Sequence, residues 1–98
     1  MELLNEKFEV ETMKSKEYTF EVTEVYRGMD VYAKISPTEK QQSPDKVTIT
    51  VKKGTKIVRR LQLKDVAFAI GREQGTYKVI VANKNPLKVS GTVKVVSV

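Results

Sequence analysis

The stretch Tyr18-Thr19-Phe20-Glu21-Val22 decides the fold class, because apolar and polar side chains alternate in it without a break. This alternation is typical of a β-strand that packs one face against a core and exposes the other. The same pattern recurs in Val31-Tyr32-Ala33-Lys34-Ile35, in Val47-Thr48-Ile49-Thr50-Val51 and in Tyr77-Lys78-Val79-Ile80-Val81. The chain is therefore predicted to be built from strands.

The composition indicates the same fold class. Val, Ile and Thr account for 29 of the 98 residues, against five Leu and four Ala, a mixture that suits pleated sheets and is poor for helices. Shorter alternating stretches near Phe8–Val10, Ile57–Leu63 and Val89–Val95 bring the total to about seven strands. We expect an all-β fold, an antiparallel β-sandwich of about seven strands with Ig-like or jelly-roll-like topology.

Two segments between these strands need separate treatment. Ser36–Asp45 contains two Pro, two Gln and two Ser, and it is predicted to be a solvated loop. Asp65–Gln74 fits either an additional strand or one short helical turn, and its charged tip, Arg72-Glu73, is bracketed by Gly71 and Gly75. In the C-terminal strand, Gly91 interrupts the apolar row and predicts a bulge or a close approach of neighbouring backbones.

The length and the hydropathy pattern limit the organisation of the chain. With 98 residues and no linker, we expect one domain (1–98). No run approaches 18 apolar residues, and Met1–Lys7 is charged and lacks the apolar core of a signal peptide. We expect a soluble chain with no membrane span and no signal peptide, and its compartment is unknown from the sequence. High Lys and Glu with few Asn and no Cys is typical of a thermophile.

Several classes of chemistry are excluded by the composition. The chain contains no His, Cys or Trp, so it has no disulfide, no Cys/His zinc site, no thiolate nucleophile and no imidazole base. No Ser lies in a Gly-x-Ser-x-Gly elbow, and there is no glycine-rich phosphate loop. Asp30, Asp45 and Asp65 are too scattered to predict a calcium site. We expect no enzyme activity, no catalytic residues, no metal and no cofactor.

Four segments together resemble the pre-peptidase C-terminal domains and the related Golgi-dynamics (GOLD) domains. They are Phe8-Glu9-Val10, Tyr18-Thr19-Phe20-Glu21-Val22, Arg27-Gly28-Met29-Asp30-Val31 and Gly75-Thr76-Tyr77-Lys78-Val79-Ile80-Val81. They cover most of the chain and consist of strand and turn chemistry. The resemblance implies a small β-sandwich module that binds or spaces, without chemistry of its own.

The C-terminal half is also similar to immunoglobulin-like domains. Leu61-x-Leu63-x-x-Val66, Gly75-x-Tyr77 and Ala82-Asn83 resemble the E–F corner and F strand of that fold, with Tyr77 where the tyrosine corner stands. Val79 replaces the cysteine of that strand and the chain has no Trp, which excludes a disulfide-bearing immunoglobulin domain. This resemblance too implies a binding or spacer module.

The net charge of +6 is distributed unevenly. Residues 1–24 carry a net charge of −4 and the remaining 74 residues carry +10. Residues 52–64 contain six cations and no acid, and we predict that these cations form a binding surface on a hairpin that turns at Gly54. They are Lys52, Lys53, Lys56, Arg59, Arg60 and Lys64. The alternative is that they only keep a sheet edge soluble.

The glutamates of the N-terminal strands have two interpretations. They are either the solvated faces of edge strands or a surface that pairs with the basic hairpin of a second copy. They are Glu9, Glu11, Glu17, Glu21 and Glu24. The aromatic residues Tyr18, Phe20 and Tyr77 fall on inward strand positions and are predicted to be core rather than a ligand site.

These observations predict a non-catalytic protein-interaction or structural module that uses the basic hairpin surface. The first alternative is a binder of anionic polymers, either nucleic acid or charged glycan, and the second is a self-associating structural subunit. The basic segment contains no aromatic residue, which counts against single-stranded nucleic acid. The expected partner is another protein or a second copy, with an anionic polymer as the alternative, and no small-molecule ligand is expected.

Overall fold

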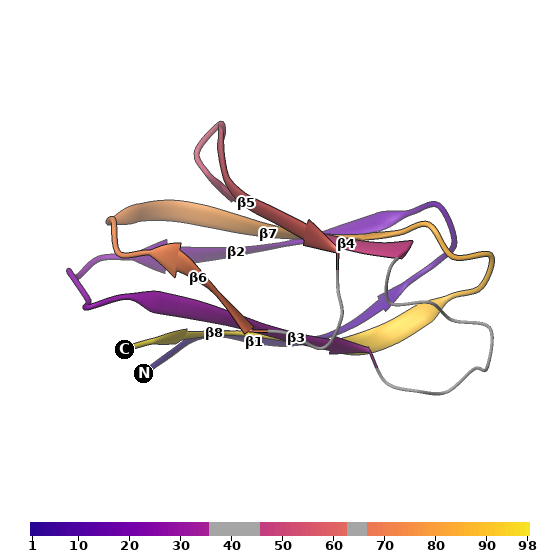
Figure 1. Cartoon of the computed structure of the whole chain (residues 1–98), viewed down its shortest axis with the longest axis horizontal. Coiled ribbons are helices and arrows are strands. Elements are labelled where there is room, and N and C mark those ends of the chain that lie inside the picture. The colour runs from indigo at the N-terminus through magenta and orange to yellow at the C-terminus, as the bar shows by residue number, and fades with distance from the viewer. Residues whose placement is uncertain (36–45, 63–66) are drawn as a thin grey trace.

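The computed structural model describes residues 1–35, 46–62 and 67–98, which form two antiparallel sheets of four strands each (Figure 1). The strands are β1 (Glu2–Val10), β2 (Ser15–Val22), β3 (Met29–Ile35), β4 (Val47–Lys53), β5 (Lys56–Gln62), β6 (Ala67–Gly71), β7 (Gly75–Asn83) and β8 (Val89–Ser97). The predicted antiparallel β-sandwich is confirmed. It has one strand more than the predicted seven, because the ambiguous segment after Asp65 contributes strand β6.

The strand order defines the topology. One sheet has the order β1-β8-β3-β6 and is called here the β1 sheet, and the other has the order β2-β7-β4-β5 and is called the β2 sheet. Strand β1 pairs with β8, β2 with β7, β3 with β6 and β4 with β5, so the chain folds as a long hairpin rolled into two layers. This is the order of a jelly roll. In the immunoglobulin order, by contrast, the first two strands lie in one sheet.

The core lies between the sheets and follows from the period-two alternation of the strands. The residues of β3 are alternately buried and exposed or half-buried, as the sequence predicts. Phe20 and Tyr77 are both buried, and their rings stack with centroids 5.2 Å apart and planes inclined by 10°. The prediction that these two aromatic residues belong to the core is confirmed.

Gly91 marks a close approach of three strands. It lies in β8 between Phe8 of β1 and Ile35 of β3, and the pairing register continues through it on both sides. A Cβ atom at this position would lie 2.1 Å from the carbonyl oxygen of Lys34 and 2.6 Å from Cζ of Phe8. Of the two predicted reasons for this glycine, close approach is therefore correct and a bulge is not.

The β4–β5 hairpin contains a register shift. Val51 pairs with Arg59, whereas the next residue, Lys52, pairs with Ile57, so Val58 is the extra residue of a bulge. This explains why the alternation of β5 is irregular. The turn at Gly54 has φ +60°, as predicted for a two-residue hairpin turn.

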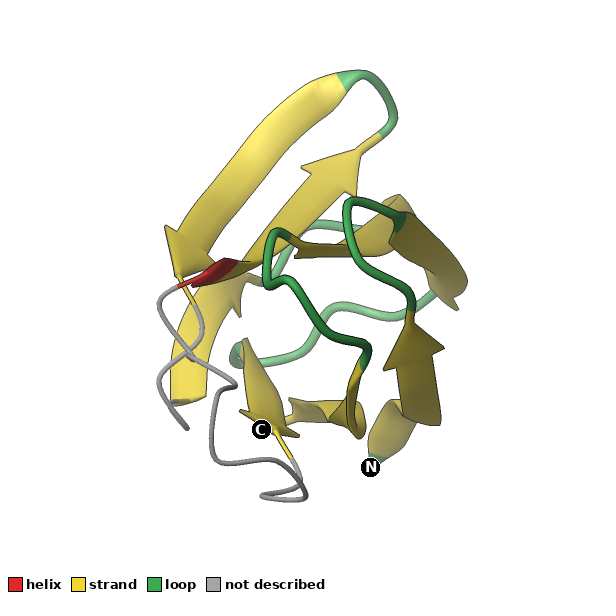
Figure 2. Ribbon diagram, turned by 90° about the vertical axis from the view of Figure 1, so that its right-hand side faces the viewer, coloured by secondary structure: helices red, strands yellow, loops and turns green. Residues whose placement is uncertain are grey.

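The two lateral edges of the sandwich differ. On one side the edge strands β1 and β2 contact each other across the two layers. On the other side are β5, the last strand of the β2 sheet, and β6, the last strand of the β1 sheet. The β4–β5 hairpin extends beyond the rest of its sheet (Figure 2).

Some predictions fall outside the described residues. They are the loop Ser36–Asp45, the cation Lys64 and the carboxylate Asp65. In the ranges that the structure does describe, no helix is long and apolar enough to cross a membrane.

Candidate functional site

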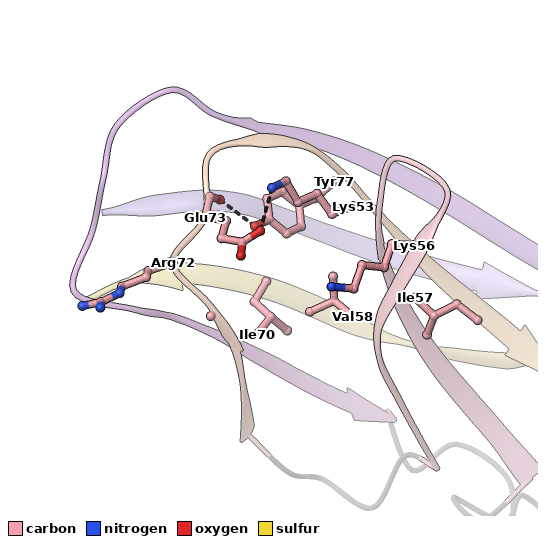
Figure 3. Close-up of a pocket in the computed structure, with 9 residues that line it drawn as sticks. Lys53, Lys56, Ile57, Val58, Ile70, Arg72, Glu73 and Tyr77 are labelled. Carbon is pink, nitrogen blue, oxygen red and sulfur yellow. Dashed lines mark hydrogen bonds and ion pairs between the residues drawn. The ribbon is translucent and has the colours of Figure 1, made fainter.

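A pocket of about 350 Å³ opens between β5, β6 and the connection from β6 to β7 (Figure 3). We call it the β5–β6 pocket. Its lining residues are Lys53, Lys56, Ile57, Val58, Ile70, Gly71, Arg72, Glu73 and Tyr77. The pocket combines aliphatic side chains from two different sheets with charged side chains at its rim, so it offers both apolar surface and electrostatic contacts to a ligand.

The rim of the pocket is held by an ion pair. The ammonium group of Lys53, at the end of β4, lies 2.7 Å from Oε2 of Glu73 in the β6–β7 connection. The hydrogen bond from Lys53 lowers the pKa of the Glu73 carboxyl, and the positive charges of Lys53 and Lys56 add to this effect. The hydrogen bond to Glu73 in turn raises the pKa of Lys53.

Gly75 provides the space that this ion pair needs. It has φ +144°, and a Cβ atom there would lie 2.8 Å from Cε of Lys53. The lysine side chain therefore passes directly over a position where only hydrogen fits without rearrangement. In the sequence, Gly75 is only one of the two glycines that flank the charged tip Arg72-Glu73. In the structure it allows Lys53 to reach Glu73.

Tyr77 holds the backbone of the β6–β7 connection in place through a hydrogen bond. Its hydroxyl donates a 2.6 Å hydrogen bond to the carbonyl oxygen of Glu73, four residues upstream. A hydrogen bond from a tyrosine hydroxyl to the backbone a few residues upstream also occurs in the tyrosine corner, which the resemblance to immunoglobulin-like domains implied at Tyr77. Burial raises the pKa of the Tyr77 hydroxyl, so it remains a donor well into the alkaline range.

The apolar part of the pocket lies between the two sheets. Ile70 of β6 is only 4% exposed, whereas Ile57 of β5 is 44% exposed.

The charged residues of the pocket differ in their pairing. Within the described ranges, Lys56 and Arg72 have no ion-pair partner. The Arg72 side chain points away from the other labelled residues, so Lys53, Lys56 and Glu73 are the charges that face the opening (Figure 3).

The cations predicted to form one basic surface are divided between two faces of the hairpin. Lys53 and Lys56 line the β5–β6 pocket, whereas Lys52 and Arg60 line a hollow on the outer face of the β2 sheet. The guanidinium of Arg59 lies 5.9 Å from the centre of the Phe68 ring of β6. Lys64 lies outside the described residues.

Seven pocket residues were not anticipated as site residues: Ile57 and Val58 of β5, and five residues on β6, on β7 or in the connection between them. These five are Ile70, Gly71, Arg72, Glu73 and Tyr77. The signal that could have identified them is the charged tip Arg72-Glu73 between two glycines. Sequence alone does not reveal that this tip folds back over the β4–β5 hairpin, because that contact depends on the strand order.

The N-terminal glutamates are exposed, and several are partnered by lysines of the same chain. Lys88 lies 3.7 Å from Glu9, and Lys78 lies 3.8 Å from Glu17. The pair Lys94–Glu2 is separated by 3.4 Å. Each of these pairs joins an edge strand to the strand beside it or to the connection leading into that strand. Three glutamates of β1 and β2 are thus paired with lysines of the same chain: Glu2, Glu9 and Glu17.

The pocket is suited to binding rather than to reaction chemistry. Among its described lining residues, the carboxylate of Glu73 is engaged by Lys53, and the hydroxyl group of Tyr77 is engaged by a backbone carbonyl. In residues 1–35, 46–62 and 67–98, no group of three acidic side chains is placed to hold a metal ion.

Comparison with known proteins shows the fold. No family model matches the chain, and no curated protein matches its sequence significantly. The structure is similar to that of PliG from Aeromonas hydrophila, a periplasmic lysozyme inhibitor of g-type lysozyme, with a TM-score of 0.62 and 14% identity over 99% of this chain and 87% of PliG. It is also similar to PirA, with a TM-score of 0.52 and 14% identity over 96% of this chain and 93% of PirA.

Proposed function

We propose that this protein is a non-catalytic interaction module whose partner is another protein, bound at strand β5 and in the β5–β6 pocket. The observation that carries the proposal is the character of β5. It is an edge strand none of whose residues is fully buried, and it carries the exposed Ile57 beside Lys56, Arg59 and Arg60. Apolar surface surrounded by cations is typical of a protein-binding surface.

An exposed edge strand also offers a second kind of contact. Its free N–H and C=O groups accept an extended segment of a partner, which lengthens the sheet by one strand. The cations of β5 repel a second β5 and attract an acidic segment. We therefore infer a partner with an extended acidic segment, in which an apolar side chain enters the pocket and carboxylates contact Lys56 and its neighbours.

The similarity to PliG gives independent support at the level of the fold. PliG is an inhibitor of a lysozyme and therefore acts on a protein, and its fold extends over nearly the whole of this chain. The resemblances to pre-peptidase C-terminal and immunoglobulin-like domains remain predictions and imply the same kind of non-catalytic module. A fold supports many functions, so the proposal depends on the pocket and on β5.

The test is an affinity capture experiment. The purified chain is immobilised, an extract of the source organism is treated with nuclease and passed over it, and the retained proteins are identified. The double variant Lys53→Glu, Lys56→Glu reverses the charge at the pocket. Its matched control, Lys78→Glu, Lys94→Glu, makes the same change in net charge on the outer faces. We expect one protein species to bind the wild type and the control, and to lose at least tenfold in affinity for the pocket variant after it is purified.

Equal loss of that species from both variants would contradict the proposal, because binding would then follow net charge. Light scattering of the purified chain tests the second alternative, self-association. A stable oligomer that dissociates in the pocket variant would assign β5 to a second copy of the chain instead of a foreign protein.

A further inference from the structure

The outer face of the β2 sheet carries a hollow of about 420 Å³ that the proposed function does not use. Three cations line it: Lys52 of β4, Arg60 of β5 and Lys84 just after β7. Three hydroxyl side chains lie among them: Ser15, Thr48 and Thr50. No carboxylate of the described residues lines the hollow. We call it the outer hollow.

The charges of the outer hollow are not balanced by nearby carboxylates of the described residues. Lys78 and Lys94 each lie within 4 Å of a glutamate of the neighbouring edge strand. No such pair forms at Lys52, Arg60 or Lys84 within the described ranges. Glu17, the carboxylate in the same cross-strand row as Thr50, is already paired with Lys78. The hollow therefore gathers three unpaired cations with no described carboxylate in its lining, and this concentration of charge attracts an anionic ligand.

The hollow is also built on an ordered platform. Nε of Arg60 donates a 3.2 Å hydrogen bond to Oγ1 of Thr50, its partner across the β4–β5 pairing. Thr50 is 6% exposed although its side chain is on the outer face. This hydrogen bond uses one donor of the guanidinium, sets its orientation and leaves its remaining N–H groups available.

The positions of the charges favour an elongated ligand. Lys52, Thr50 and Thr48 are alternate residues of β4, so their side chains rise from one face about 6–7 Å apart. Arg60 stands beside Thr50, and Lys84 lies beyond Ala82, which pairs with Thr48. The cations are therefore spread along the strands with hydroxyls between them, as a linear polyanion requires and a single small anion does not.

We propose that the outer hollow binds an acidic glycan, through its sulfate, phosphate or carboxylate groups and its hydroxyls. Charge-assisted hydrogen bonds from Lys and Arg bind such groups, and Ser and Thr hydroxyls both donate to and accept from sugar hydroxyls. Single-stranded nucleic acid is disfavoured, because none of the described residues that line the hollow is aromatic, and proteins of that class bind bases by stacking.

The test uses the whole chain, labelled with ¹⁵N, and a heparin hexasaccharide as probe. We expect amide shifts at Thr48, Thr50, Lys52 and Arg60, and no comparable shifts at Ile70 or Glu73 in the β5–β6 pocket. The triple variant Lys52→Gln, Arg60→Gln, Lys84→Gln is expected to lower the affinity at least tenfold. Its matched control, Lys78→Gln, Lys88→Gln, Lys94→Gln, removes the same charge and is expected to change it less than threefold.

Titrations with other probe ligands identify which chemical groups the hollow binds. Oligogalacturonate tests whether carboxylates suffice, and neutral dextran is expected not to bind. Equal losses of heparin affinity in the two triple variants, or shifts spread over both sheets, would overturn the proposal. A single-stranded oligonucleotide of matched charge that binds the hollow more tightly than heparin would overturn the assignment to a glycan. Circular dichroism of each variant establishes that a loss of affinity is not a loss of fold.

Discussion

The two lateral edges of this jelly roll, β1–β2 and β5–β6, differ in character. Strand β2 is an edge strand of the β2 sheet, and it buries Phe20 and Val22. Strand β5 is the other edge strand of the same sheet, and it has no fully buried residue. Strand β2 thus contributes to the core, whereas strand β5 borders a pocket and carries an exposed apolar side chain. Stability and binding therefore depend on opposite edge strands of one sheet.

We call the β1–β2 edge the closed edge and the β5–β6 edge the open edge. The largest effect on stability is expected at the closed edge. Replacing Phe20 with Ala removes a buried ring that stacks on Tyr77, and it should lower the free energy of unfolding by about 3–5 kcal/mol. For a domain of this size that is a large part of the total stability. Urea denaturation measures the loss. A melting temperature within about two degrees of the wild type would show that this edge does not stabilise the fold as the comparison requires.

The next effect is expected where β8 passes between β1 and β3. Gly91→Ala places a methyl group against the backbone oxygen of Lys34 and the ring of Phe8, and the backbone oxygen cannot rotate away. Overpacking of this kind costs about 1–3 kcal/mol, and more when backbone must move. Gly28→Ala is the matched control, because a Cβ atom there meets nothing within 4 Å. Equal stability of the two variants in thermal denaturation would be inconsistent with the close approach.

Stability at the open edge is expected to change little while binding changes greatly. Ile57→Ser removes a side chain that is 44% exposed, so the free energy of unfolding should change by no more than about 0.5 kcal/mol. Affinity for the protein partner should fall at least tenfold. Calorimetry and a binding titration measure the two quantities on the same sample. A large loss of stability with unchanged binding would reverse the roles of the two edges.

The smallest effect concerns the ion pair at the pocket rim. The pKa of Glu73 should lie below its ordinary value of 4.5 in an NMR titration, because Lys53 donates a hydrogen bond to it. The contribution of Glu73 to stability is present above the ordinary carboxyl range and is lost as the pH falls through the lowered pKa. Lys53→Gln should return the pKa toward 4.5. An unchanged pKa in that variant would mean that the ion pair does not form in solution.

The fold class could be predicted because the alternation is local. Phe20, Val31 and Val79 face inward at the positions that a period of two assigns to them. The strand order could not be predicted, because it depends on pairings such as Val10 with Val89 that are distant in the sequence. The turn at Gly54 is a local feature, whereas the space above Gly75 is used by Lys53 from another strand.

The same distinction explains what could be predicted of the site. The cations of residues 52–64 are conspicuous in the sequence, and the alternation would place neighbours such as Arg59 and Arg60 on opposite faces. The bulge at Val58 depends on the pairing of β5 with β4, and the contact of the Arg59 guanidinium with the Phe68 ring depends on the packing of the opposite sheet. Neither can therefore be predicted from the local sequence. The β5–β6 pocket arises only when the β6–β7 connection is laid beside the β4–β5 hairpin.

The most direct test of the account places a photoactivatable benzoylphenylalanine at position 57, on the open edge, and separately at position 19, on an exposed site of the closed edge. Irradiation of each protein in an extract of the source organism reports which edge contacts a partner. If β5 binds the partner, we expect one discrete protein adduct from position 57, abolished by excess wild-type chain but not by excess Ile57→Ser, and no such adduct from position 19. An adduct of the same partner from position 19 and none from position 57 would contradict this assignment.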